Sequence, residues 1–203
     1  MSTASTSPLT EQTSQPYPYK VHCSDERATA ALVQSLARVF LQFILSQFHQ
    51  HSGAPHLHIS LQGDLGSGKT TAVRYLLKEL GYTGKVKSPT YSLCEPHTLE
   101  IDGRQISLYH FDFYRMQSPS EWIEAGLQEH FVRQEPSICI VEWPEKASGT
   151  LPLMDLCIEI TANNSIGQEN EHHRSVTFEA KTSTGKALLK NLVLAHQNQV
   201  PHS

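Results

Sequence analysis

The sequence has 203 residues and a formal net charge of −4, with 38% hydrophobic and 18% charged residues. This length suits one globular domain, and the acidic balance gives no general field that would attract nucleic acid or an anionic membrane. The four cysteines form no C-x-x-C pair, which indicates a reduced, cytoplasmic protein. We expect no signal peptide and no membrane span, because the longest apolar stretch, VFLQFILSQF, is too short and too polar.

The N-terminal residues 1–18 are rich in Ser, Thr, Gln and Pro and lack hydrophobic periodicity, which predicts a disordered tail. A helix should follow, with Ser24 or Asp25 as its N-cap and an apolar stripe that ends before HQHSGAPH. We assign residues 19–197 to a single P-loop domain and residues 198–203 to a flexible C-terminal tail.

The segment GDLGSGKTT, Gly63–Thr71, follows an alternating strand, LHISLQ. It is followed by a helical pattern over Lys69–Leu80, which Gly81 closes at the C′ position. A glycine-rich turn between a strand and a helix is the context that a P-loop requires, and the segment matches G-x-x-x-x-G-K-[ST] completely.

This loop has the chemistry of a phosphate cradle. Its glycines leave room for phosphate oxygens near the main chain, and successive N–H groups at a helix N-terminus attract an anion. Lys69 should bridge the terminal phosphates of ATP, and the hydroxyl of Thr70 should bind Mg²⁺. The expected nucleotide-binding residues of the loop are Gly63, Asp64, Leu65, Gly66, Ser67, Gly68, Lys69, Thr70 and Thr71.

The rest of the chain alternates strands and helices. Strands are expected at 105–114, 138–141, 155–161 and 174–180, and a final helix at 185–196. Ser118–Glu121 reads as a capping box that begins another helix, which Gly126 should break or kink. The pattern predicts an α/β, P-loop NTPase-like fold with a central, mostly parallel sheet and helices packed on it.

A P-loop protein also needs a carboxylate near the metal. Glu142 closes the apolar run ICIVE, and Asp112 lies in HFDFYR, so either could be the acid that binds Mg²⁺. A GTPase is not expected, because the N-K-x-D and D-x-x-G motifs are not found in the right places.

Three further blocks accompany the P-loop: VKSPTYSL (Val86–Leu93), YHFDFYR (Tyr109–Arg115) and IVEWPE (Ile140–Glu145). In this order and spacing, the four blocks resemble the bacterial TsaE family, also called YjeE, over roughly residues 20–195. Ser67 stands where that family commonly has alanine, a small change that P-loops tolerate. The segment NNSIGQENEHH falls outside the resemblance.

The resemblance implies an ATPase that acts with the TsaB–TsaD complex in N6-threonylcarbamoylation of adenosine 37 in tRNAs reading ANN codons. ATP hydrolysis to ADP would reset that complex between turnovers. Contact with tRNA is expected to be only indirect. No contact with DNA is expected. Hydrolysis by the chain alone should be weak.

The resemblance also implies roles for individual residues. Glu142 would be the carboxylate beside the metal ion, and Asp112 would be the acid near the γ-phosphate. Thr90 would sense that phosphate and Trp143 would lie at the site. Glu26 and Arg174 would lie at the base and ribose side of the nucleotide.

Several readings stay open. His110 could act as a base, or could orient Asp112, which lies on the same strand face by alternation. The histidine-rich connection between residues 49 and 58 lacks Cys, Asp and Glu, and we do not expect a metal site there. A P-loop small-molecule kinase and a nucleotide-dependent binding module without significant turnover remain alternative functions.

Overall fold

A computed structural model describes residues 18–50, 55–89, 91–132, 135–162 and 173–197. The two predicted tails lie outside these residues, apart from Pro18, and so does Thr90. The disorder of the tails and the role of Thr90 therefore stay predictions.

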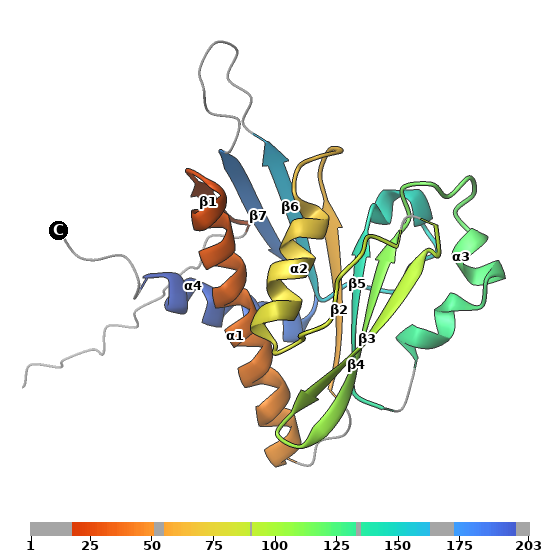
Figure 1. Cartoon of the computed structure of the whole chain (residues 1–203). Helices are drawn as coiled ribbons and strands as arrows, with labels where there is room; N and C mark the ends of the chain where they lie inside the picture. The colour runs from red at the N-terminus through yellow and green to blue at the C-terminus, as the bar shows by residue number, and fades with distance from the viewer. Residues whose placement is uncertain (1–17, 51–54, 90, 133–134, 163–172, 198–203) are drawn as a thin grey trace, which may run out of the picture.

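One seven-stranded mixed sheet organises the described chain, in the order β1-β7-β6-β2-β5-β4-β3 (Figure 1). β6, β2, β5 and β4 pair in parallel at its centre, while β7, β1 and β3 pair antiparallel at its two sides. This arrangement confirms the expected α/β fold with a mostly parallel central sheet. The strands are Tyr19–Cys23 (β1), His56–Gln62 (β2), Cys94–Ile101 (β3), Arg104–Asp112 (β4), Ser137–Glu142 (β5), Leu156–Ala162 (β6) and Arg174–Ala180 (β7).

Two outer strands, β1 and β3, are absent from the sequence-based expectation. β3 reads CEPHTLEI, with Pro96 inside it, and a proline normally argues against a strand. Because β3 pairs only with β4, it is an edge strand, where a residue without an N–H group is tolerated. β4 also ends at Asp112, two residues earlier than expected.

The helices cover both faces of the sheet. α1 (Glu26–Gln50), α2 (Lys69–Glu79) and α4 (Ser183–Gln197) share a core with Ile106 and Leu108 of β4. α3 (Glu121–Glu124) and the 3-10 segment η1 (Leu127–Phe131) lie on the other face, in a second cluster with Tyr109 and Phe111. The two clusters use alternate residues of β4, because successive strand side chains point to opposite faces. A further 3-10 turn, η2, spans Pro144–Ala147.

α1 is longer than the apolar stretch seen in the sequence. With 25 residues it is long and apolar enough to cross a membrane by length and composition alone, so the expectation that this stretch is too short was wrong. One side of the helix is nevertheless buried in the protein, and the helix contacts α2 and α4, so it packs as a core helix. Its buried apolar residues are Leu32, Val33, Leu36, Ala37, Val39, Phe40, Ile44 and Phe48.

The structure decides between the two proposed N-caps of α1. Asp25 Oδ1 accepts a hydrogen bond from the Ala28 N–H at 2.7 Å, so Asp25 is the cap. α2 ends as expected, with Gly81 at a φ of 89° directly after its C-cap, Leu80.

The predicted capping box was wrong in detail. The helix begins at Glu121 rather than at Pro119, and its N-cap Ser120 makes no side-chain cap bond. The Glu121 carboxylate instead accepts a hydrogen bond from the Gln117 N–H at 2.8 Å, one residue before the expected partner. Gly126 breaks the helix as expected, at a φ of 76°.

Candidate nucleotide-binding site

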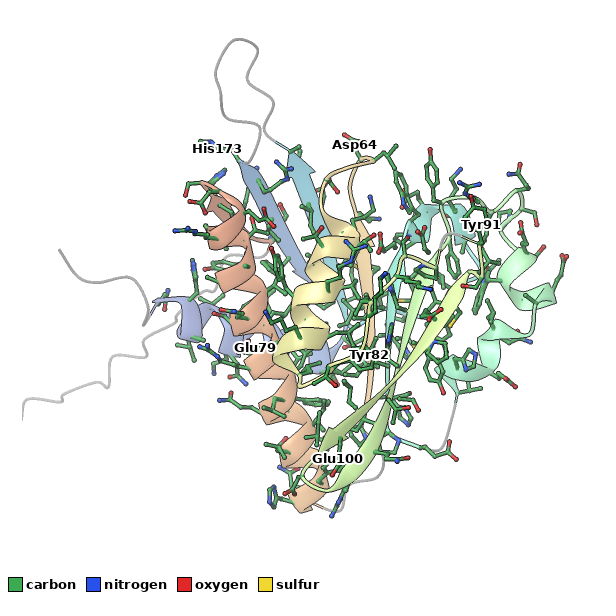
Figure 2. The ribbon with its side chains drawn as sticks, viewed as in Figure 1. Asp64, Glu79, Tyr82, Tyr91, Glu100 and His173 are labelled. Atoms are coloured by element: carbon green, nitrogen blue, oxygen red, sulfur yellow. The ribbon has the colours of Figure 1, made fainter. Side chains whose placement is uncertain are left out.

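The P-loop connects β2 to α2 at the end of the sheet where the parallel strands finish. Figure 2 shows Asp64 of this loop, Tyr91 of the following connection and His173 before β7 at the same end of the molecule. Segments far apart in the sequence therefore lie at the same end of the molecule as the P-loop.

Gly63 has no room for a side chain. Its φ is 133°, and a Cβ atom there would lie 2.1 Å from the carbonyl oxygen of Ile160 in β6. The loop begins in close contact with the sheet, and glycine is the residue that permits that contact. Gly66 and Gly68 also have positive φ, at 79° and 108°, so the backbone can curl around an anion.

The Lys69 side chain binds back to the start of its own loop. Its Nζ donates hydrogen bonds to the carbonyl oxygens of Gly63, at 2.5 Å, and Asp64, at 2.9 Å. Burial lowers the pKa of its ammonium group, and nearby carboxylates, that of Glu142 first, oppose this shift. The amine also lies 3.8 Å from the ring centroid of Trp143. A buried cation is thus held beside the loop amides, where it can meet a phosphate.

Glu142 is the carboxylate that reaches the P-loop. Its Oε2 accepts a hydrogen bond from the Thr70 hydroxyl at 3.0 Å, and its Oε1 lies 2.7 Å from His110 Nε2. Only 2% of Glu142 is exposed. A hydroxyl and a buried carboxylate in contact form the kind of oxygen donor set that suits Mg²⁺. The residues present therefore fit the metal that the sequence motif implies.

Asp112 is paired with Glu142 in the register of the adjacent parallel strands β4 and β5. Its Oδ2 accepts a hydrogen bond from Ser88 Oγ at 2.8 Å, and its Oδ1 accepts one from the Tyr114 N–H at 3.1 Å. His110 contacts Glu142, so the suggestion that it orients Asp112 was wrong. Both acids lie in the same site, with different partners.

Trp143 holds an unusual backbone conformation at the end of β5. Its φ is 59°, in the left-handed region that large residues rarely occupy. Its N–H donates to the Leu61 carbonyl of β2 at 3.2 Å, and its ring lies 4.9 Å from that of Tyr114. This turn carries the indole over Lys69.

These groups line one cleft of about 440 Å³. Arg115 also borders the cleft, with its guanidinium 4.5 Å from the ring of Tyr91. The lining residues are Leu65, Gly66, Gly68, Lys69, Thr70, Thr71, Ser88, Asp112, Tyr114, Arg115, Glu142 and Trp143.

A second recess, of about 190 Å³, also borders the P-loop and is lined by Glu26 and Arg174 together. Arg174 Nε donates to the Ser67 carbonyl at 3.0 Å, and the Tyr75 hydroxyl donates to Glu26 Oε1 at 2.5 Å. Gly66, Gly68 and Thr71 border both recesses, so one elongated ligand could occupy both.

The structure adds residues that the sequence did not single out. Ser88 belongs to the SPTY block, where only Thr90 was given a role, and Tyr114 belongs to HFDFYR. Their position inside those blocks was the available signal. Two of the histidines expected in the connection between residues 49 and 58 belong to β2 instead: His56 Nδ1 lies 2.9 Å from Ser137 Oγ, and the ring of His58 packs on Phe131.

A sequence model described as "Threonylcarbamoyl adenosine biosynthesis protein TsaE" matches residues 23–176. The chain belongs to the TsaE family. The similarity expected from the four sequence blocks is thus confirmed, and it covers the P-loop, both acids and Arg174.

Two TsaE relatives carry the name "tRNA threonylcarbamoyladenosine biosynthesis protein TsaE". The Haemophilus influenzae protein is 39% identical over 140 residues, which are 69% of this chain and 78% of that protein. The Bacillus subtilis protein is 35% identical over 134 residues, or 66% and 76%. The crystal structure of Bacillus subtilis YdiB aligns with a TM-score of 0.63 at 28% identity, covering 89% of this chain and 97% of the other.

Proposed function

We propose that this protein binds Mg²⁺-ATP and hydrolyses it to ADP in the biosynthesis of threonylcarbamoyladenosine in tRNA. The observation that carries the proposal is the meeting of Lys69, Thr70 and Glu142 at one P-loop. Membership of the TsaE family supports the pathway.

The protein's own groups would act mainly by position and charge. The loop amides and the Lys69 ammonium group would hold the phosphates and stabilise the negative charge on the transferring phosphoryl group. Thr70 and Glu142 would hold Mg²⁺, which supplies further charge neutralisation at the phosphate oxygens when it is bound. Asp112, held by Ser88 and Tyr114, would orient the attacking water.

The second recess suits the nucleoside end of ATP. Glu26 offers a carboxylate that can accept hydrogen bonds, and Arg174 offers a planar cation beside the P-loop carbonyl of Ser67. We propose that these two residues contact the base and ribose, while the phosphates reach into the larger cleft.

We further propose that the partner is the TsaB–TsaD complex, that ATP hydrolysis resets this complex between turnovers, and that the modified base is adenosine 37 of tRNAs reading ANN codons. Arg115 is the arginine at the cleft. Among the described residues, no second arginine lines the cleft. We therefore expect slow hydrolysis without a partner. The four cysteines are free thiols, which suits a cytoplasmic location.

Hydrolysis is tested with Lys69→Ala and Glu142→Ala. Each should abolish phosphate release at saturating Mg²⁺-ATP, because each removes a group that would bind the phosphates or the metal. Lys78→Ala is the matched control, since Lys78 is an exposed lysine on the same helix, α2. Wild-type turnover in either site variant would show that the site is wrongly assigned.

The alternatives predict different products. A small-molecule kinase would yield a phosphorylated acceptor instead of free phosphate. A binding module would release no phosphate, even with TsaB–TsaD, although ATP and ADP would change its affinity for that complex. Multiple-turnover measurement of threonylcarbamoyladenosine on tRNA, with TsaB–TsaD and with or without this protein, tests the pathway role directly.

A further inference from the structure

His110 and Glu142 form a buried contact that the proposed chemistry does not yet use. Their side chains are 0% and 3% exposed, and Nε2 lies 2.7 Å from Oε1. A carboxylate removed from water needs hydrogen-bond donors, because an unpaired buried charge is costly. His110 supplies such a donor from β4, the strand next to the one that carries Glu142.

The two oxygens of Glu142 have different partners. Oε2 meets the Thr70 hydroxyl, which borders the phosphate cleft, and Oε1 meets His110, which does not border it. Because both oxygens are held, the carboxylate cannot rotate without losing a bond. The imidazole thus fixes the orientation in which the Glu142 carboxylate presents an oxygen to the P-loop.

His110 is also the end of this chain of hydrogen bonds. Among the residues that the structure describes, its Nδ1 has no hydrogen-bond partner. A proton relay would need a further group at that nitrogen, whereas a group that only orients the carboxylate does not. The arrangement has the form of a metal ligand held by an outer hydrogen-bond partner.

We propose that His110 is a positioning residue for Glu142 and sets the affinity of the site for the divalent cation that accompanies ATP. The inference rests on the proposed Mg²⁺-ATP binding and deepens it, since the imidazole acts on the cation only through Glu142. Removing such an outer partner typically lowers metal affinity by about 10- to 100-fold.

The chain offers a matched control. His97 lies on β3, the other neighbour of β4, and is 2% exposed. In the described part of the chain neither of its ring nitrogens has a hydrogen-bond partner, and its ring packs against Tyr82 at 4.8 Å. It is a buried histidine of the same sheet without the contact to Glu142.

The test compares His110→Asn with His110→Gln. The Gln amide nitrogen can reach the place of Nε2, whereas the shorter Asn side chain cannot. Binding of a non-hydrolysable ATP analogue, followed by tryptophan fluorescence, to which Trp143 at the site contributes, is measured without Mg²⁺ and over a Mg²⁺ titration. ATPase rates over the same titration then separate the Mg²⁺ requirement from kcat.

His110→Asn should raise the half-saturating Mg²⁺ concentration about 10- to 100-fold. Its metal-free analogue affinity and its kcat at saturating Mg²⁺ should stay near wild type. His110→Gln should remain within a few-fold of wild type, and His97→Asn should be unchanged. If His110→Asn does not fold, His110→Leu, which also lacks a donor, makes the same comparison.

An unchanged Mg²⁺ requirement in the Asn or Leu variant would overturn the inference. So would equal losses in the Asn and Gln variants together with weaker metal-free binding, because those changes indicate a role in packing alone. Failure of the wild-type protein to bind the analogue at all would overturn the proposed function, and the inference with it.

Discussion

Trp143 and Gly63 both contact Lys69, and both have a positive φ. Trp143 accepts a left-handed backbone conformation that disfavours a large side chain, at a cost of about 1–2 kcal/mol. Its contacts with Leu61 and Lys69 offset that cost. Gly63 has no side chain because the carbonyl of Ile160 occupies the space.

We expect Gly63→Ala to destabilise the protein strongly. The new Cβ would lie 2.1 Å from the Ile160 oxygen, so the loop or β6 must move. Overpacking costs about 1–3 kcal/mol, and the positive φ adds about 1–2 kcal/mol. Urea unfolding measures the loss. Gly103→Ala is the control: Gly103 also has a positive φ, but its Cβ would meet nothing within 4 Å, so only the conformational cost should appear.

α1 joins the site to the rest of the fold through its first turn. Glu26 lines the second recess, and Asp25 caps the helix directly before it. The cap therefore fixes where the helix begins and, with it, the position of the Glu26 side chain. Sequence alone could not choose between Ser24 and Asp25, because both residue types are good N-caps.

Asp25→Ala should lower the free energy of unfolding by about 1 kcal/mol, because the Ala28 N–H loses its acceptor. Ser24→Ala should have a much smaller effect. Chemical denaturation of both variants makes the comparison. Equal losses would show that the cap has been assigned to the wrong residue.

The elements that the sequence predicted have strong local signals, whereas those that it missed depend on how strands pair. The P-loop, β2 and α2 were predicted because their signals are local and strong. The edge strand β3 was missed because its pattern is broken by Pro96. The contact of His110 with Glu142 was also missed, since it depends on the parallel register of β4 and β5, which sequence spacing does not specify.

The C-terminal helix is tied into the sheet through Asp155. Asp155 Oδ2 accepts a hydrogen bond from the His58 N–H at 2.9 Å, and Oδ1 accepts one from the Thr182 hydroxyl at 2.5 Å. The Thr182 oxygen in turn accepts the Gly185 N–H of α4 at 3.0 Å. One carboxylate thus links β2 to the start of the last helix.

This link allows the single-domain assignment to be tested. Thr182→Val keeps the shape of the side chain but removes both hydrogen bonds, and should cost about 1–3 kcal/mol. Circular dichroism and tryptophan fluorescence should still report one coincident urea transition. Thr184→Val, in the same turn, should be close to neutral. If helical signal were lost before the fluorescence of Trp122 and Trp143 changes, α4 would be a separate unit.

β6 and β7 each contact the P-loop at one point. The Ile160 carbonyl lies against Gly63 at the start of the loop, and Arg174 binds the Ser67 carbonyl near its end. A loop fixed at both ends has little conformational entropy left to lose when a ligand arrives. The encounter with nucleotide can then be as fast as diffusion and charge allow, and differences in affinity between nucleotides should appear chiefly as differences in residence time.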